Sequence, residues 1–431
     1  MHAMRRIASS VPWLVGVILA SSLTPAQASA RAIAWVDQFG SRSSESGTWG
    51  LDVVASDVFT GGRTFGSLSG QVSRGGADAW IRRTDARGAA VWTAQFGTPA
   101  FDNVEDVDAT SSGVYVLGAT RGALGGPSAG GTDAYLAAFD RDGKRLWTTQ
   151  FGVRQDDWGI SVVEGKAGIY VYGQTFGAFP GHRNRGGGDL FIALFDRQGS
   201  LLWIRQFGSR GHEEPWAMEA AHDGVYIDGY TDGRLGRARV GSWDAYVSFI
   251  SADGEVVWLR QFGSTQADFA SGLSADASGV YVSGQTFGAL PGATNRGGSD
   301  AFVQKFSPMG SSAWTRQFGT REDDAAGSAA LVQSEVVVAG TTDGAFLGHT
   351  NLGATDVFAH AFVAAGGEPG WTLQFGTRRT ETVGWALGGG NRVFVIGDTS
   401  GAFPGATSAG GVDSYLVRID VNGSRRGGSR R

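Results

Sequence analysis

The sequence predicts an all-β fold of seven similar units, and three observations support it. Gln-Phe-Gly recurs at intervals of 55 to 57 residues, which indicates a repeat architecture. No segment shows a sustained helical period, and 70 glycines in 431 residues are unfavourable for a helical protein. The first and last units are incomplete in complementary ways. The seven tripeptides begin at Gln38, Gln95, Gln150, Gln206, Gln261, Gln317 and Gln374.

Each complete unit is interpreted as four short strands. In the second complete unit, residues 104–110 and 114–120 are separated by a turn, and 114–120 is rich in β-branched and aromatic residues. A Gly-rich loop follows, and then 133–140 and 144–151 flank an Arg-Asp-Gly hairpin signal. Four antiparallel strands in each unit, repeated seven times, are typical of a seven-bladed β-propeller.

The two ends of the chain predict how the ring closes. Residues 33–40 supply only the final strand of a unit, whereas 382–420 supply three strands and then end without a Gln-Phe-Gly. We expect the N-terminal strand to complete the last blade, with Trp35 beside 413–420, because this leaves fewer sheet edges exposed. An open solenoid would need polar capping units, and none is visible in the sequence.

The segments outside the propeller (31–423) have their own patterns. Residues 1–30 combine Arg5 and Arg6, an apolar run and Ala28-Ser29-Ala30, a combination typical of a signal peptide cleaved after Ala30. The alternative is an uncleaved anchor, but the run is short for a membrane span. Residues 424–431 are expected to form a disordered basic tail. We therefore expect a secreted, periplasmic or cell-surface protein without an integral membrane segment after cleavage.

Composition excludes several classes of function. Without Arg5 and Arg6 the chain has 34 basic and 41 acidic residues, a formal charge of -7, which disfavours nucleic acid as a partner. The absence of cysteine excludes disulfides, thiolate metal sites and cysteine nucleophiles. We expect a monomer held together by packing.

Three further features recur in the units. A Trp precedes each Gln-Phe-Gly by three positions and is expected to fill the gap between neighbouring blades. Gly-x-Thr-x-Gly ends each second strand, where Thr can bond a loop backbone group. An acidic residue follows each Gln-Phe-Gly glycine by five positions, and an Asp opens each third strand. The two acidic sets are Glu45, Asp102, Asp157, Glu213, Asp268, Asp324 and Glu381, and Asp78, Asp133, Asp189, Asp244, Asp300, Asp356 and Asp413.

These carboxylates have two interpretations. They can cap turns or pair with the loop arginines, or they can bind cations, since oxygen clusters suit Ca²⁺. The best local candidates for a metal are the pairs Asp156-Asp157 and Asp323-Asp324, although neither has the spacing of a calcium loop. Otherwise no cofactor is expected.

No catalytic motif is evident. The mature chain has five histidines, none paired at helical metal-ligand spacing, and no Gly-x-Ser-x-Gly elbow occurs. The histidines are His182, His212, His222, His349 and His360.

The unit spanning 208–263 departs most from the others and is the best candidate for a ligand site. Aromatic, Arg and carboxylate groups that converge on one rim would suit a sugar or an acidic peptide. Drift in a redundant repeat is the alternative. The candidate residues are His212, Glu213, Glu214, Trp216, Asp228, Tyr230, Arg234, Arg237, Arg239 and Trp243.

Three segments of one unit form a recognisable pattern: Val-Tyr-Val-x-Gly-x-Thr at 280–286, Leu-Pro-Gly at 290–292 and Asp-Ala-Phe-Val-x-Lys-Phe at 300–306. In these segments the repeat resembles the bacterial SBBP family of seven-bladed β-propellers. The resemblance covers nearly all of 31–420 and implies an exported or surface-associated bacterial protein. Gly125-Gly126 and Leu347-Gly348 depart from the Pro-Gly pattern in their loops.

Three function hypotheses follow. The first is an exported, non-enzymatic binding or scaffold protein that uses the loop-rich face, with an extracellular protein or glycan as its partner. The second is a quinoprotein-like dehydrogenase, since Asp140 to Trp147 looks like the Asp-x-x-x-Gly-x-x-x-Trp of those blades. The longer repeat and the missing Cys pair oppose it. The third is a hydrolase or lyase in the axial channel, which predicts a cluster of groups with shifted pKa there.

Overall fold

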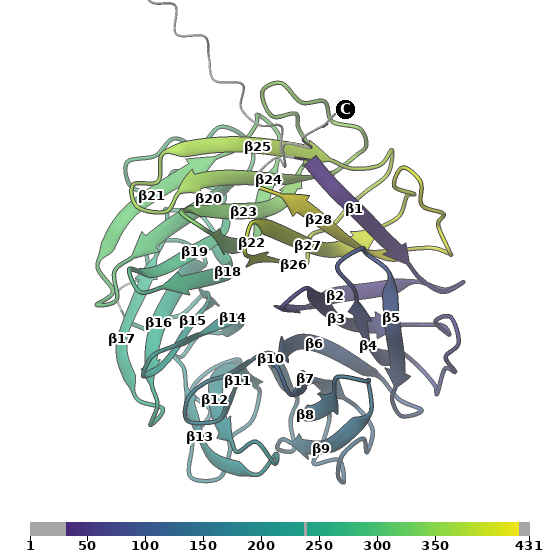
Figure 1. The fold of residues 1–431 in the computed structure, drawn as a ribbon. Helices are drawn as coiled ribbons and strands as arrows, with labels where there is room; N and C mark the ends of the chain where they lie inside the picture. Colours follow the sequence, from purple (N-terminus) through teal and green to yellow (C-terminus); the bar gives the residue numbers. More distant parts are fainter. Residues whose placement is uncertain (1–31, 237–238, 422–431) are drawn as a thin grey trace, which may run out of the picture.

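Seven four-stranded antiparallel sheets stand around a common axis in the computed structural model, which describes residues 32–236 and 239–421 (Figure 1). The described residues contain 28 strands and no helix. The protein is therefore a seven-bladed β-propeller, as the sequence predicts. The expected signal peptide and the basic tail lie outside the described residues.

The blades follow one another along the chain. Blade 1 consists of β2 (Glu45–Val54), β3 (Asp57–Thr64), β4 (Asp78–Thr84) and β5 (Ala90–Phe96). Blade 2 consists of β6 (Asp102–Ala109), β7 (Gly113–Thr120), β8 (Asp133–Asp140) and β9 (Arg145–Phe151). Blade 3 consists of β10 (Asp157–Glu164), β11 (Ile169–Thr175), β12 (Asp189–Phe195) and β13 (Leu201–Phe207). Blade 4 consists of β14 (Glu213–Ala221), β15 (Gly224–Thr231), β16 (Asp244–Ser251) and β17 (Val256–Phe262).

The remaining blades have the same order, except for the last. Blade 5 consists of β18 (Asp268–Asp276), β19 (Gly279–Thr286), β20 (Asp300–Phe306) and β21 (Ser312–Phe318). Blade 6 consists of β22 (Asp324–Val332), β23 (Glu335–Thr342), β24 (Asp356–Val363) and β25 (Pro369–Phe375). Blade 7 consists of β26 (Trp385–Gly389), β27 (Arg392–Thr399), β28 (Asp413–Asp420) and, from the other end of the chain, β1 (Ala32–Phe39).

Closure of the ring occurs as predicted. β1 pairs antiparallel with β28, and Trp35 lies opposite Arg418 (Figure 1). The Gln38 side chain donates to the carbonyl of Gly401 and to Asp413, and its amide oxygen accepts the N–H of Phe403. The N-terminal strand is thus tied to the last blade through side chains as well as through the sheet ladder.

One polar network explains the recurring motif residues. In blade 1, Gln95 Nε2 donates to Asp78 Oδ2 at 2.7 Å, and Asp102 at the start of blade 2 accepts the Thr120 hydroxyl at 2.5 Å. Asp78 and Asp102 are both fully buried. A Cβ on Gly97 would lie 2.8 and 2.9 Å from their oxygens, so the tripeptide requires Gly. The turn-capping interpretation of both acidic sets is confirmed, because each carboxylate also accepts a backbone N–H. No ion pair joins either set to a loop arginine in 32–236 or 239–421.

The outer-strand tryptophans join neighbouring blades, as expected. Trp92 donates its indole N–H to the carbonyl of Arg141 at 2.9 Å, and its ring lies against Gly143 in the hairpin of blade 2. Gly143 belongs to the segment from Asp140 to Trp147 that looks like a quinoprotein blade motif. In this structure, Gly143 provides the contact with Trp92 of the preceding blade. The apolar core lies between adjacent sheets, where Phe59 of blade 1 packs in one cluster with Val104 and Tyr135 of blade 2.

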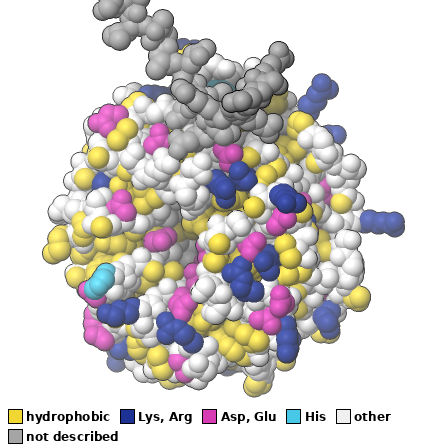
Figure 2. All heavy atoms as spheres, in the orientation of Figure 1, with side chains coloured by type: hydrophobic (Ala, Val, Ile, Leu, Met, Phe, Trp, Pro, Cys, Tyr) yellow, Lys and Arg dark blue, Asp and Glu magenta, His cyan; other side chains and the backbone are white. Residues whose placement is uncertain are grey.

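The two faces of the ring differ. The long loops between second and third strands, and the connections between blades, lie on one face, named here the loop-rich face. Short turns occupy the opposite face, where Ala32 pairs with Asp420. Figure 2 shows basic and acidic side chains interspersed over one face of the ring. In the described part of the chain, no helix is long and apolar enough to cross a membrane.

Candidate functional site

The predicted site in the 208–263 unit divides between two hollows on the loop-rich face. Arg234 and Arg239 line a groove between blades 3 and 4, named here the arginine groove. Glu214 and Trp216 line a separate cavity at the mouth of the axial channel, named here the axial cavity. The two hollows differ in charge, and they are described in turn.

Three loops of blades 3 and 4 bring basic side chains into the arginine groove, whose volume is about 1080 Å³. One loop joins β11 to β12, the second joins β13 to β14, and the third joins β15 to β16. The equivalent loops of blades 5 and 6 form a smaller hollow lined by Arg296, Arg321 and Glu322, so this groove differs in having more basic side chains. The basic lining residues are His182, Arg183, Arg185, Arg210, Arg234 and Arg239.

The arginines in this groove have no acidic partners among the described residues. None of the five forms an ion pair, and all are exposed. Arg239 donates instead to the backbone carbonyl of Asp232 at 2.9 Å. Asp232 is the acidic residue in the lining, and its Oδ1 accepts a hydrogen bond from the backbone N–H of His212 at 2.6 Å. The groove therefore has a strong excess of positive charge.

Aromatic side chains pack around His212, which follows Gly211 of the arginine groove. The His212 ring lies 6.0 Å from Trp243 and 5.7 Å from Phe176, measured between ring centroids. Tyr230 in turn lies 5.5 Å from Trp243 and 4.8 Å from Phe269. These contacts join the groove to the axial cavity, since His212 Nε2 also bonds Glu214, a lining residue of that cavity, at 2.6 Å.

Two of the predicted residues are not on the rim. Glu213 and Asp228 were expected to converge there, but both side chains are fully buried. Glu213 begins β14 and accepts bonds from the Ser209 N–H and from the Thr231 hydroxyl, as the acidic residue does in other blades. Asp228 accepts the N–H of Ala217. The expected place of both was wrong, because strand alternation points Glu213 inward and Glu214 outward. Arg237 lies outside the described residues.

Four tryptophans from four blades line the axial cavity, which has a volume of about 390 Å³. They are Trp49 of β2, Trp158 of β10, Trp216 of β14 and Trp385 of β26. Trp49 is 37% exposed, a large fraction for an indole on an inner strand. Within 32–236 and 239–421, no ring contact joins any two of the four, so they surround the cavity without filling it.

Carboxylates outnumber basic groups in the axial cavity. Glu105, Asp106 and Glu214 line it together with Arg63. Burial raises the pKa of Glu105 to about 8 and that of Asp106 to about 7, against hydrogen bonds that lower them. Burial, with repulsion from Asp52 and Asp106, also raises the pKa of Glu219 to about 8. The cluster of shifted carboxyl groups expected for an axial site is therefore present.

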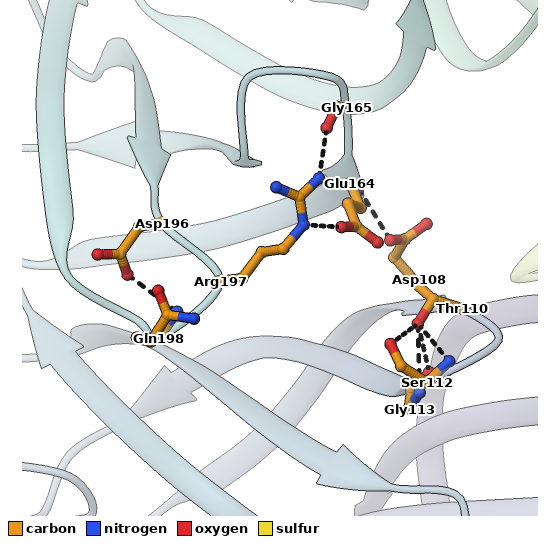
Figure 3. A network of polar contacts seen from close by, with 9 residues as sticks. All are labelled: Asp108, Thr110, Ser112, Gly113, Glu164, Gly165, Asp196, Arg197 and Gln198. Atoms are coloured by element: carbon orange, nitrogen blue, oxygen red, sulfur yellow. Dashed lines mark hydrogen bonds and ion pairs between the residues drawn. The ribbon is translucent and has the colours of Figure 1, made fainter.

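Some of these carboxylates also join the inner strands of neighbouring blades. Asp106 accepts the N–H of Val162 at 2.9 Å, and Asp108 accepts the N–H of Glu164 at 2.8 Å. Figure 3 shows Asp108 beside Glu164, which in turn pairs with Arg197 near the turn of blade 3. Asp106 and Asp108 thus have a structural role, whereas the side chain of Glu219 forms no hydrogen bond or ion pair among the described residues.

All four metal candidates accept backbone N–H groups of loops on this face. Asp156 accepts the N–H of Thr132, and Asp323 accepts the N–H of Ser299. Asp157 and Asp324 are buried and accept backbone N–H groups four residues earlier in the chain. In the described ranges, no group of three or more acidic or histidine side chains could hold a metal ion.

Sequence reasoning found part of both hollows and missed the rest. It did not assign Trp49, Trp158 and Trp385 to a site, nor Glu105 and Asp106. The sequence does distinguish these three tryptophans. They do not occupy the Trp position that recurs before each Gln-Phe-Gly, and they lie near the start of inner strands. The other basic residues that line the arginine groove were harder to identify from the sequence, because arginine is frequent in all the loops. The missed groove residues are His182, Arg183, Arg185 and Arg210.

Comparisons with known proteins support the fold and little more. No protein-family model matches the chain. The regulatory protein FlaEY of Caulobacter vibrioides is 26% identical in an alignment 280 residues long, which covers 58% of this chain and 28% of that protein. Among solved structures, hydrazine synthase of Kuenenia stuttgartiensis has a TM-score of 0.51 at 11% identity, over 81% of this chain and 92% of that one. Sqt1 of Chaetomium thermophilum has a TM-score of 0.48 at 10% identity, over 91% and 100%. At 11% identity, the likeness to hydrazine synthase shows the fold alone.

Proposed function

We propose that the protein is an exported, non-enzymatic binding protein that recognises an anionic glycan in the arginine groove. One observation carries the proposal: arginines from three separate loops converge on one hollow without acidic partners. Unpaired guanidinium groups are well suited to carboxylate, sulfate or phosphate groups, which they bind through paired N–H donors.

A glycan is favoured over an acidic peptide by the aromatic side chains beside the groove. Trp243 ends the loop that carries Arg234 and Arg239, and its half-buried ring contacts those of His212 and Tyr230. It offers apolar ring surface, which packs well against the face of a sugar ring. The position of the groove on the loop-rich face also favours a binding function, because loops on a rigid scaffold can vary without loss of the fold.

Two further points support the exported and non-enzymatic parts of the proposal. The resemblance to the SBBP repeat family and the leader pattern of residues 1–30 favour export. The relative from Caulobacter vibrioides is named a regulatory protein, which agrees with a binding role. N-terminal sequencing of the protein recovered from a producing bacterium tests the export and expects a start at Arg31.

A direct binding measurement tests the ligand. The mature chain is titrated with oligogalacturonate, with an uncharged glucan of the same length and with polyglutamate. We expect tight binding of oligogalacturonate alone, weakened by salt, because the attraction is electrostatic. The double variant Arg183→Ala/Arg234→Ala removes guanidinium groups from two of the loops and should weaken binding at least tenfold.

The matched control is Arg87→Ala, which removes an exposed arginine from the turn between β4 and β5 on the opposite face. This variant should bind like the natural chain. Equal binding by the groove variant would refute the site, and preferential binding of polyglutamate would show that the partner is an acidic peptide.

A second candidate function, a hydrolase in the axial channel, is favoured by the raised pKa of Glu105. A carboxyl group with a pKa of about 8 stays protonated at neutral pH, as a general acid must. Incubation with chromogenic glycosides tests this function. Turnover that disappears in Glu105→Gln would establish an enzyme, and its absence over a broad panel would favour the binding function.

A further inference from the structure

The axial cavity has features that the proposed glycan site does not explain. Of the 14 tryptophans, seven occupy the recurring outer-strand position and Trp80 is fully buried. Apart from Trp13, which lies outside the described residues, five remain, and four of these line this one cavity. An indole ring exposed to a cavity loses the packing that would stabilise it, so its presence in four blades needs a separate reason.

The chemistry of the lining points to a cation with apolar parts. Indole faces attract ammonium groups through the ring quadrupole and also cover methylene groups. Three carboxylates face the same space against the single guanidinium of Arg63, which donates to Ser46 at 2.9 Å. A bound cation would favour the ionised forms of these carboxyl groups, whereas a neutral sugar would not, and a bare metal ion would not need the indoles.

A further carboxyl group lies along the axis from the cavity. Glu219 follows Trp216 by three residues on β14, which is about 10 Å along a strand. Its carboxyl group is close enough to Asp52 and Asp106 to be repelled by both, and no basic side chain among the described residues pairs with it. A ligand that carries several positive charges would relieve this repulsion, which a single ammonium group in the cavity would not.

We propose that the axial cavity binds a linear aliphatic polyamine, with one ammonium group among the four indoles and the rest of the chain beside the axial carboxylates. The volume of about 390 Å³ lies within the range of small-molecule sites. This site is independent of the arginine groove, which has the opposite charge. The polyamine proposal can therefore be refuted without refuting the proposed glycan-binding function, and the reverse also holds.

Calorimetric titration of the mature chain with spermidine tests the proposal. We expect one spermidine to bind, more tightly than tetramethylammonium, which can occupy the indoles but not the axial carboxylates. Trp49→Leu removes one exposed indole, Glu214→Gln removes a carboxylate of the cavity, and Glu219→Gln removes a carboxylate further down the axis. Each variant should weaken spermidine binding at least fivefold, and only the first two should weaken tetramethylammonium binding.

Glu255→Gln is the matched control, because Glu255 is exposed in the turn between β16 and β17, away from the axis. It should leave spermidine binding unchanged, and unchanged thermal unfolding in all variants excludes misfolding. The proposal is overturned if spermidine does not bind at millimolar concentration, or if the cavity variants bind it as the natural chain does. Binding of cellobiose that is lost in Trp49→Leu and Glu214→Gln, without spermidine binding, would make the cavity a neutral sugar site instead.

Discussion

Replacement of Gln38 by Ala tests the closure of the ring most directly. The side chain lies on β1 and makes three hydrogen bonds to blade 7: to the Gly401 carbonyl at 2.9 Å, to the Asp413 carboxylate at 2.8 Å and from the Phe403 N–H at 3.0 Å. These partners lie more than 360 residues away along the chain. The bonds therefore form only when the N-terminal strand has completed the last blade.

The magnitude follows from these three bonds. Two neutral bonds contribute about 1 kcal/mol each and the bond to a carboxylate about 1.5–3 kcal/mol, so Gln38→Ala should lower the free energy of unfolding by about 3–5 kcal/mol. If the ring unfolds as one unit, an unfolding entropy of about 2.1 cal/mol/K per residue converts this loss to a fall in Tm of about 4–6 °C.

Differential scanning calorimetry and hydrogen exchange measure the effect. Gln150→Ala is the matched control, because Gln150 bonds Gly122, Leu124 and Asp133 of its own blade. Both variants should lose similar stability, but only Gln38→Ala should speed amide exchange in β1 and β28. A Gln38→Ala variant with unchanged Tm and unchanged exchange, alongside a destabilised Gln150→Ala, would refute closure through the N-terminal strand.

Three further predictions concern stability. Gly97→Ala should destabilise the ring by about 2–4 kcal/mol in urea unfolding, because its Cβ would lie 2.8 Å from a buried carboxylate oxygen, whereas at Gly126 the nearest atom is 3.8 Å away and Ala should be tolerated. Trp92→Ala should cost about 2–4 kcal/mol in the same assay, and a loss below 0.5 kcal/mol would contradict its role between blades. The pKa of Glu219 is raised to about 8 in the fold, so the folded state holds the proton more tightly and its stability falls as pH rises from about 4.5 to 8. Glu219→Gln should therefore raise Tm at pH 8.5 and leave it nearly unchanged at pH 4, and equal shifts at both values would exclude this titration.

The sequence by itself determined the ring of blades. Each blade contacts its neighbour in the same way, so the residues that make these contacts recur at a fixed interval. In blade 1 they are Trp92, Gln95, Phe96 and Gly97. Closure could also be predicted, because residues 33–40 lack three partner strands and 382–420 lack one. These are local and periodic features, and a linear pattern records them fully.

Only the tertiary structure decided which non-repeating side chains meet. Trp49 and Trp385 lie at opposite ends of the chain, and ring closure places them in one cavity. The direction of Glu213 and Glu214 also required the start of β14, since one residue of register moves a side chain from a buried network to the axial cavity. Convergence around an axis depends on the geometry of the whole ring, and no local sequence pattern carries that information.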